Sequence, residues 1–337
     1  MKALNIAILG ASGAVGTEIL KILEERNFPV KELKLLDISS EVVIWKNKEY
    51  TIENVSDTSF DGVDITFNAT NNDIAMRLCP IAVSKGSIVI DNSSAYRLDP
   101  NVPLIVPEVN PEAVVNHSGI IANPNCSTII ALTAIGPLHK YAKIKRMSVA
   151  TYQAVSGAGM AGIDELKNQT KNFIEGKEVK EVNMNAFQHQ IAFNVIPHID
   201  AFEENGYTKE ELKMLYEGRK ILNCPNLKVN TTCVRVPVFR SHSEAITIET
   251  ERKITVEKAL EILSTAPGVK LVDDVSNNKY PMPIDTSDQD LVFVGRIRED
   301  ISAENSLNIW VCGDQIRKGA ATNAVQIAEL LLEKGLV

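Results

Sequence analysis

The apolar positions in the first third of the chain fall into short continuous runs separated by stretches with helical spacing. Residues 4–9 form the first run and predict a buried strand, after which Val15, Ile19, Ile22 and Leu23 recur at helical intervals. Further strands are predicted over residues 33–36, 64–69, 87–90 and 103–106, with loops rich in Asn, Asp, Ser and Pro between them. This alternation is typical of a parallel α/β sheet.

The second half of the chain has longer stretches of β-branched residues. They predict strands over residues 143–155, 228–239, 244–250, 290–298 and 306–312, which we expect to form one extended antiparallel sheet. Helices are predicted over residues 159–174, 208–222 and 256–263, and a last helix over about 319–332. The change of pattern predicts a domain boundary near Cys126.

Composition narrows the functional classes. The chain has 337 residues, of which 45% are hydrophobic, so two domains with real cores are expected. The net charge of -8, without a run of Lys and Arg interleaved with aromatic residues, argues against nucleic acid as a partner. The first apolar run is too short for a signal sequence or a membrane span, so no membrane partner is expected. Five scattered cysteines without zinc spacing predict a reduced, cytoplasmic setting and no metal site.

The segment 10–16, Gly-Ala-Ser-Gly-Ala-Val-Gly, lies between the first strand and the first helix. Gly10 and Gly13 in this setting allow a tight turn and a close approach of backbone to a pyrophosphate, and Gly16 lets the helix lie near the sheet. The helix N-terminus offers N–H groups to the phosphates. The loop therefore predicts a dinucleotide site, as opposed to a simple tight turn, formed by Gly10, Ser12, Gly13, Ala14 and Val15.

Asp37 ends the second predicted strand, where an acidic residue usually binds the hydroxyls of the adenosine ribose. A carboxylate at this position favours NAD, because it would repel the 2′-phosphate of NADP. The alternative interpretation is a helix-capping or turn aspartate.

Cys126 is the candidate nucleophile. It follows Asn123-Pro124-Asn125 and precedes an apolar run at residues 129–132, so Asn125 or Cys126 is expected at a helix N-cap. The helix dipole and the N–H groups there lower the pKa of a thiol. The same N–H groups, with the Asn125 amide, are expected to bind a developing oxyanion. Cys79, Cys224, Cys233 and Cys312 are interpreted as small buried hydrophobes.

A catalytic thiol needs a base, and the sequence has five histidines: His117, His139, His189, His198 and His242. The sequence alone does not show which of them lies near Cys126. His242, in the polar segment 240–244 beside a predicted strand, is the most typical of an active site.

Together with the glycine loop, seven further segments resemble the aspartate-semialdehyde dehydrogenase family, and the resemblance covers essentially the whole chain. In chain order they are residues 91–97 (Asp-Asn-Ser-Ser-Ala-Tyr-Arg), 107–110, 123–128, 151–159, 210–213, 233–242 and 313–315. The resemblance implies NADPH-driven reductive dephosphorylation of L-4-aspartyl phosphate to L-aspartate 4-semialdehyde, a reversible step in lysine, threonine and methionine biosynthesis.

The resemblance also implies residue roles. Cys126 matches the nucleophile that carries the acyl group as a thioester, His242 matches the acid/base, and Gln153 matches a residue that positions the substrate and the thiol. Arg235 matches the arginine that binds the substrate α-carboxylate, a role suited to its planar fork. Glu210 matches the carboxylate facing the α-ammonium, whereas Glu211 has a simpler role in a capping box with Thr208.

The phosphate-binding set of the family matches Arg97, Asn125 and Lys213. Without the resemblance, Arg97 and Lys213 would be interpreted as charges on a solvated face. Ser156, Gly157 and Gln315 match contacts to the cofactor near its nicotinamide ring.

The implied fold is an α/β, Rossmann-like dinucleotide-binding domain with an inserted α+β catalytic and dimerisation domain. We therefore expect domains at residues 1–127 and 128–314, with residues 315–337 forming a helix that returns to the first domain. A homodimer or homotetramer is expected. One departure concerns the cofactor, because NADP-using members have an Arg-Ser pair after the second strand and this chain has Asp37 followed by Ser39 and Ser40. The family implies NADP, and these residues favour NAD or use of both.

Two alternatives remain. Another acyl-phosphate reductase, such as the N-acetyl-γ-glutamyl-phosphate type, also uses a Cys–His pair, but an N-acetylated substrate has no ammonium group for Glu210 to meet. A non-catalytic nucleotide-binding paralogue would be expected to lose Cys126 or His242, and both are present.

Overall fold

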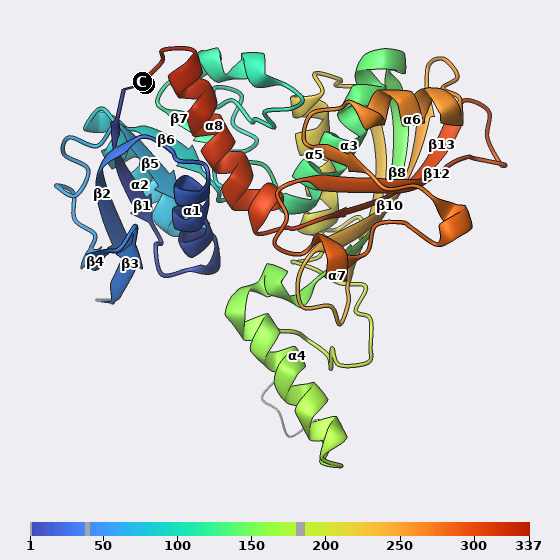
Figure 1. Cartoon of the computed structure of the whole chain (residues 1–337), viewed down its shortest axis with the longest axis horizontal. Coiled ribbons are helices and arrows are strands. Elements are labelled where there is room, and N and C mark those ends of the chain that lie inside the picture. The colour runs from blue at the N-terminus through green and yellow to red at the C-terminus, as the bar shows by residue number, and fades with distance from the viewer. Residues whose placement is uncertain (1, 38–40, 180–185) are drawn as a thin grey trace. The chain divides into compact units, whose positions relative to one another are not determined.

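The computed structural model describes residues 2–37, 41–179 and 186–337. It divides into two compact units (Figure 1). Unit 1 comprises Met1–Ile129 with Gly319–Val337, and unit 2 comprises Ile130–Lys318. The chain thus leaves the first unit once and returns to it at its C-terminal helix.

Unit 1 is built on a twisted sheet that has seven strands within the described residues, in the order β3-β4-β2-β1-β5-β6-β7. The strands are β1 (Leu4–Leu9), β2 (Val30–Asp37), β3 (Val42–Trp45), β4 (Lys48–Asn54), β5 (Ile65–Asn68), β6 (Ile88–Asp91) and β7 (Ile120–Ala122). All neighbours pair in parallel except β3 and β4, which form an antiparallel hairpin. The predicted Rossmann-like parallel sheet is confirmed.

Helices cover both faces of this sheet. α1 (Ala14–Glu25) and α8 (Thr322–Glu333) bury their apolar residues in one cluster against β1, β2 and β5, and α2 (Asn72–Ser84) contributes to a second cluster that contains Ala7 and Leu36. Figure 1 shows α8 beside α1 although the two helices stand at opposite ends of the sequence. This packing returns the C-terminal segment to unit 1.

Several features of unit 1 differ from the sequence-based expectation, since β3, β4 and β7 were not predicted. Residues 103–106 form no strand, only a single parallel bridge from Leu104 to Ala122, because the Val106 N–H donates to the Asn110 side chain and not to a neighbouring strand. α2 was not predicted: its first turn is polar, and Pro80 lies inside it. Asn71 caps that helix by accepting from the Ile74 N–H at 3.0 Å.

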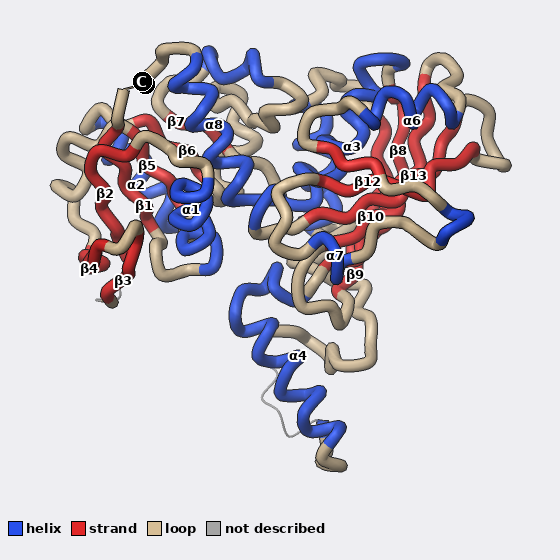
Figure 2. The backbone as a smooth tube through the Cα atoms, in the orientation of Figure 1, coloured by secondary structure: helices blue, strands red, loops and turns tan. Residues whose placement is uncertain are grey.

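Unit 2 contains a sheet with six strands in the described part of the chain, in the order β11-β12-β13-β10-β8-β9 (Figure 2). The strands are β8 (Ile144–Gln153), β9 (Lys228–Arg235), β10 (His242–Thr250), β11 (Val269–Leu271), β12 (Val292–Glu299) and β13 (Ser306–Gly313). The expectation of a purely antiparallel sheet is wrong, because β8 pairs with β9 in parallel and β11 pairs with β12 in parallel. Both parallel pairs lie at edges, where a helix connects strands that run in the same direction.

Three helices of unit 2 lie close to their predicted positions, whereas the short α7 (Pro283–Thr286) was not predicted. The three are α4 (Gly159–Ile174), α5 (Lys209–Ile221) and α6 (Val256–Ser264), while α3 (Cys126–Ala142) begins in unit 1 and runs into unit 2. α5 packs on β9, and α6 packs on β11 and β12. None of the helices formed by the described residues combines the length and apolarity needed to span a bilayer.

Candidate active site

The loop after β1 leaves room only for glycine at two positions. Gly10 has φ +85°, and a Cβ there would lie 2.7 Å from the Ala69 carbonyl oxygen; a Cβ on Gly16 would lie 2.2 Å from the Gly10 carbonyl oxygen. Gly13 is the N-cap of α1 and has no side chain to accept from the first-turn N–H groups. The loop therefore presents backbone donors at a helix N-terminus, an arrangement that fits the pyrophosphate of a dinucleotide.

Asp37 is tied to this loop. Its Oδ2 accepts from the Ser12 N–H at 3.1 Å and from the Ser12 hydroxyl at 2.5 Å. The carboxylate at the end of β2 is thus held next to the glycine loop, where the predicted adenosine ribose would lie. Ser39 and Ser40, the other predicted cofactor contacts in this region, lie outside the described residues.

Cys126 is the first residue of α3, as predicted, and is partly buried. Asn125 caps the helix, since its Oδ1 accepts from the N–H groups of Ser127 at 3.1 Å and Thr128 at 3.3 Å. The thiol therefore stands in the first turn, at the positive end of the helix dipole. Two of the N–H groups expected as oxyanion donors already have an acceptor within the chain.

Arg97 holds the segment that precedes Cys126. Its side chain is only 8% exposed, so the solvated-face interpretation is wrong. Nε donates to the Asn123 carbonyl at 2.9 Å and Nη2 to the Asn92 carbonyl at 2.8 Å. The Asn123 amide also donates to Asn92 and accepts from Asn323 of α8. These bonds fix the backbone two residues before Asn125.

In unit 2, three of the predicted site residues are neighbours across adjacent strands. Gln153 of β8 pairs in register with Arg235 of β9, and Gln153 Nε2 lies 3.4 Å from Nε2 of His242, the first residue of β10. All three side chains are buried. Arg235 Nη1 donates to the Ala154 carbonyl at 2.7 Å, and its guanidinium stacks over the Phe187 ring. We call this the Arg235–Gln153–His242 row.

His242 is neutral at physiological pH. Burial, followed by the charge of Arg235, lowers the pKa of its imidazole to about 3. The Ala154 N–H donates to Nδ1 at 3.0 Å, so the neutral ring carries its proton on Nε2, the nitrogen next to Gln153.

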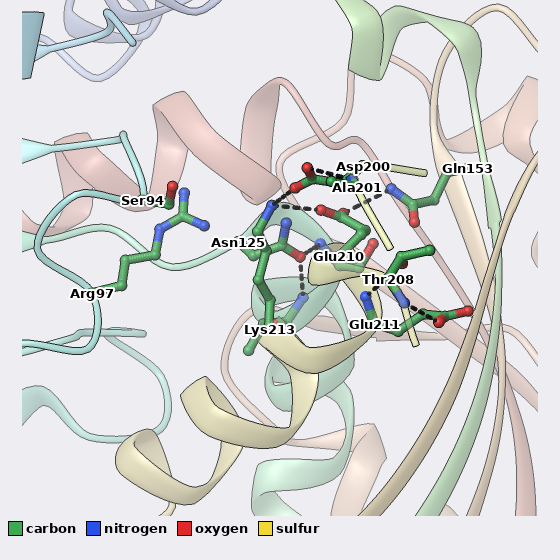
Figure 3. A network of polar contacts seen from close by, with 12 residues as sticks. Ser94, Arg97, Asn125, Gln153, Asp200, Ala201, Thr208, Glu210, Glu211 and Lys213 are labelled. Carbon is green, nitrogen blue, oxygen red and sulfur yellow. Dashed lines mark hydrogen bonds and ion pairs between the residues drawn. The ribbon is translucent and has the colours of Figure 1, made fainter. Parts of the chain in front are cut away.

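Residues of α5 complete this part of the site (Figure 3). Glu210 accepts from Gln153 Nε2 at 3.2 Å and from Lys213 Nζ at 2.9 Å, and Lys213 also donates to Asp200 at 3.0 Å. Burial alone would lower the pKa of the Lys213 ammonium, but the two carboxylates outweigh it and raise that pKa above its ordinary value. Glu210 and Lys213, expected to bind different groups of the substrate, are thus ion-paired with each other, and Lys213 does not lie on a solvated face.

The predicted capping box at the start of α5 is confirmed. The Glu211 N–H donates to the Thr208 hydroxyl, and Glu211 Oε2 accepts from the Thr208 N–H at 2.8 Å. Glu211 is therefore committed to the helix terminus, unlike Glu210.

Ser156, Gly157 and Gln315 lie next to the same row. A Cβ on Gly157 would approach Arg235 Nη1 to 2.7 Å and His242 Cε1 to 3.5 Å, so the absence of a side chain lets the guanidinium lie there. Gln315 Nε2 donates to the Ser156 hydroxyl, and Gln315 Oε1 accepts from the Ser241 N–H at 3.0 Å. The amide thus links the segment after β8 to the residue before His242.

Sequence reasoning missed the residues that hold these side chains. Asp314 is fully buried and accepts from Arg240 Nε at 2.6 Å, which anchors the chain just before Ser241 in its left-handed conformation (φ +71°). Asp200 was missed as the second partner of Lys213. A polar pair separated widely in sequence leaves no local pattern, so no signal marked these residues.

Three of the remaining histidines make contacts close to them in sequence, and three of the remaining cysteines are buried. His139 of α3 accepts from the Ile144 N–H, His117 accepts from the Gly119 N–H, and His198 stacks on Phe202. Burial raises the pKa of the Cys79, Cys233 and Cys312 thiols, as expected of small buried hydrophobes. The same interpretation was wrong for Cys224, which is only partly buried. Among the residues that the structure describes, no group of three or more His, Cys, Asp or Glu side chains could hold a metal ion.

Comparison with known proteins agrees with this geometry. The family model described as "Semialdehyde dehydrogenase, NAD binding domain" matches residues 5–117, and "Semialdehyde dehydrogenase, dimerisation domain" matches residues 135–318. Aspartate-semialdehyde dehydrogenase of Aquifex aeolicus is 55% identical, with 99% of each chain covered, and that of Bacillus subtilis is 46% identical, with 100% and 99% covered. The crystal structure of aspartate semialdehyde dehydrogenase II from Vibrio cholerae, complexed with ASA, superimposes with a TM-score of 0.95 at 45% identity, covering 99% of both chains.

The fold and the two matched domains define a nicotinamide-dependent dehydrogenase of the semialdehyde class. Within that class, relatives 46% to 55% identical over essentially the whole chain leave one assignment: the protein belongs to the aspartate-semialdehyde dehydrogenase family. The resemblance and the fold class inferred from the sequence are both confirmed.

The depressed pKa of His242 predicts a pH-dependent stability. The unfolded chain binds the imidazole proton below its ordinary pKa of 6.5, whereas the folded chain does so only near 3. The unfolded state is therefore favoured as the pH falls through this window. We expect the free energy of unfolding of the wild type to fall more steeply than that of His242→Asn between pH 6.5 and 5, by up to about 1.4 kcal/mol per pH unit. Urea titrations at several pH values measure this, and parallel slopes would contradict the burial of a neutral imidazole.

The contact between Gly157 and Arg235 predicts a substrate-binding defect. In Gly157→Ala the added methyl displaces the guanidinium, so we expect the KM for the semialdehyde to rise about tenfold, with a smaller change in kcat. The matched control is Gly218→Ala, because a Cβ in that helix would make only ordinary contacts, 3.6 Å from Met147 Cε. Steady-state kinetics decide, and equal KM values for the two variants would count against the placement of Arg235.

Proposed function

We propose that the protein catalyses the reversible NADPH-dependent conversion of L-4-aspartyl phosphate to L-aspartate 4-semialdehyde and phosphate. The observation that carries the proposal is the pair of opposite charges, Arg235 and Glu210, both buried next to Gln153. A free α-amino acid has a carboxylate for the arginine and an ammonium for the glutamate. This pair argues against an N-acetylated substrate, which has no ammonium group.

The reaction begins on Cys126. Its thiolate attacks the acyl carbon of aspartyl phosphate, the C–S bond forms, the C–O bond to phosphate breaks, and inorganic phosphate leaves. This covalent route replaces one difficult step by two easier ones. The position of Cys126 in the first turn of α3 supports the role, because the helix dipole stabilises the thiolate. Arg97, Asn125 and Lys213 are assigned to the phosphate group.

The bound nicotinamide cofactor supplies the hydride that reduces the thioester carbonyl. The hemithioacetal oxygen then carries the negative charge until the C–S bond breaks and the aldehyde leaves. We assign the His242 Nε2–H to that oxygen, since the Ala154 N–H on Nδ1 keeps the ring proton on Nε2. Gln153, next to this nitrogen, orients the substrate and the thiol.

Substrate binding has to share the Glu210 carboxylate. In this structure Lys213 donates to Glu210 and Asp200 together, so it already has a second carboxylate to hold it. When the α-ammonium of the substrate binds Glu210, Lys213 keeps its ion pair with Asp200. Its ammonium group is then available to bind the substrate phosphate. We propose that this exchange couples recognition of the amino group to recognition of phosphate.

NADP is the cofactor that we assign, with Gly10, Ser12, Gly13, Ala14 and Val15 around the pyrophosphate and Ser156, Gly157 and Gln315 near the nicotinamide. Asp37, held by Ser12, lies where it would repel a 2′-phosphate, so NAD is expected to be used as well. The match of residues 135–318 to a dimerisation domain supports a homodimer. Five cysteines that all remain thiols support a cytoplasmic location.

Phosphate-dependent oxidation of L-aspartate 4-semialdehyde tests the function. NADP and NAD are supplied in parallel, and the reduced nicotinamide is followed by absorbance. We expect turnover that requires phosphate, and the ratio of kcat/KM for the two cofactors measures the effect of Asp37. Without turnover on either cofactor the substrate assignment fails, and N-acetyl-γ-glutamyl semialdehyde becomes the next substrate to try.

Removal of the thiol tests the covalent mechanism. Cys126→Ala is expected to abolish turnover and leave the Kd for the cofactor within about twofold of the wild type, because the nucleophile is lost while the α1 loop is untouched. Cofactor binding is measured by fluorescence titration. Cys224→Ala is the matched control, and residual turnover by Cys126→Ala would exclude a thioester on this residue.

Replacement of the guanidinium tests substrate recognition. Arg235→Lys keeps the positive charge but loses the planar pair of donors, so we expect the KM for the semialdehyde to rise about tenfold or more and kcat to change less. Initial rates at saturating cofactor give both constants. An unchanged KM would remove Arg235 from the substrate site.

A further inference from the structure

A second buried acid lies on the same strand as His242. Glu244 is two residues further along β10, so its side chain points to the same face of the sheet. It is 0% exposed, and neither carboxyl oxygen has a hydrogen-bond partner within the described residues. None of the roles discussed above uses this residue.

The strand register places Glu244 directly behind the Arg235–Gln153–His242 row. Glu244 pairs with Thr151 of β8 and with Val311 of β13, and Thr151 pairs with Cys233 of β9. All four side chains are buried. Residues opposite each other on neighbouring antiparallel strands have Cβ atoms about 4.5–5.5 Å apart, so one water can bridge the Glu244 carboxyl and the Thr151 hydroxyl, which make no direct hydrogen bond.

Thr151 connects the second row, formed by Cys233, Thr151, Glu244 and Val311, to the Arg235–Gln153–His242 row. Its hydroxyl donates to Gln153 Oε1 at 3.0 Å, which turns Gln153 Nε2 toward Glu210 and His242. The hydroxyl has one proton but also two lone pairs. The Cys233 thiol already lies at hydrogen-bond distance from this hydroxyl. A donor on a lone pair of the hydroxyl keeps its proton on Gln153 and away from the sulfur.

The surroundings of Glu244 favour the neutral acid. Burial raises the pKa of its carboxyl well above the ordinary value. The titratable groups that sense its charge are thiols, Cys233 on β9 and Cys312 on β13, and no cation of the described residues forms an ion pair with it. A neutral carboxylic acid has an O–H to donate, which a carboxylate lacks.

We propose that Glu244 is a positioning residue, a neutral acid that donates to the Thr151 hydroxyl through one water and thereby keeps the Gln153 amide turned toward Glu210, beside His242. The inference deepens the proposed function, because it rests on the roles assigned there to Gln153 and His242. Loss of the Glu244 carboxyl should lower kcat, because the Gln153 amide that orients the reacting groups is disturbed. KM should change little, because the Arg235 guanidinium is not disturbed.

Three substitutions separate positioning from packing. Glu244→Gln keeps a donor at the same position, Glu244→Met replaces the carboxyl by an unbranched apolar chain, and Thr231→Val is the matched control. Thr231 lies on the same sheet in β9, and its hydroxyl is also buried without a partner in the described residues. Thr231→Val removes a buried hydroxyl but changes no residue of either row.

We expect Glu244→Met to lower kcat about tenfold with KM within about twofold, and Glu244→Gln to stay within about threefold of the wild type. Thr231→Val should keep the wild-type kcat. A wild-type kcat in Glu244→Met would overturn the proposal, and so would a loss in Glu244→Gln equal to that in Glu244→Met. A wild type that does not turn over the semialdehyde is a different result, which counts against the proposed function.

Thr151→Val supplies a second route if Glu244→Met fails to fold. It removes the hydroxyl itself, so it should lower kcat by a similar factor with KM within about twofold. A wild-type kcat in Thr151→Val would overturn the proposal.

The protonation state is measured without any substrate. The infrared difference spectrum between the wild type and Glu244→Gln at pH 7 should contain the carbonyl band of a protonated carboxyl. A carboxylate band in its place would overturn the proposal whatever the kinetics show.

Discussion

The buried guanidinium of Arg235 constrains more of unit 2 than any other single group. A charge removed from water must be met by acceptors and space, and the chain supplies the Ala154 carbonyl, the face of Phe187 and the missing side chain of Gly157. The same charge, after burial itself, keeps His242 neutral. The anion site proposed for Arg235 and the neutral state of the buried imidazole therefore both depend in part on this charge.

In unit 1, backbone N–H groups and not a buried cation provide the positive charge for an anion. The glycine loop and the first turn of α3 both present N–H groups at a helix N-terminus, one uncapped and one capped by Asn125. Arg97 and Asn323 hold the approach to α3 through carbonyl and amide groups. Each unit thus fixes its reactive group through contacts within that unit.

Local sequence signals predicted much of this structure. The limits of α4, the capping box of α5 and the start of α3 at Cys126 follow from spacing and capping chemistry, which act over a few residues. The helix that contains Pro80 and the parallel edge strands did not follow, because a proline obscures helical periodicity and strand direction depends on chain connections. The ion pair of Lys213 with Glu210 and the buried Asp314 also escaped prediction, since their partners or neighbours are set by tertiary packing.

The hydrogen bonds between Asp37 and Ser12 have a consequence for attempts to redesign the coenzyme preference. An exchange of the aspartate for a cationic residue removes a repulsive charge but also releases the turn that approaches the pyrophosphate. The coenzyme contact proposed for Asp37 and the order of the glycine loop thus depend on one carboxylate. An engineered switch therefore has to replace Asp37 and Ser12 together.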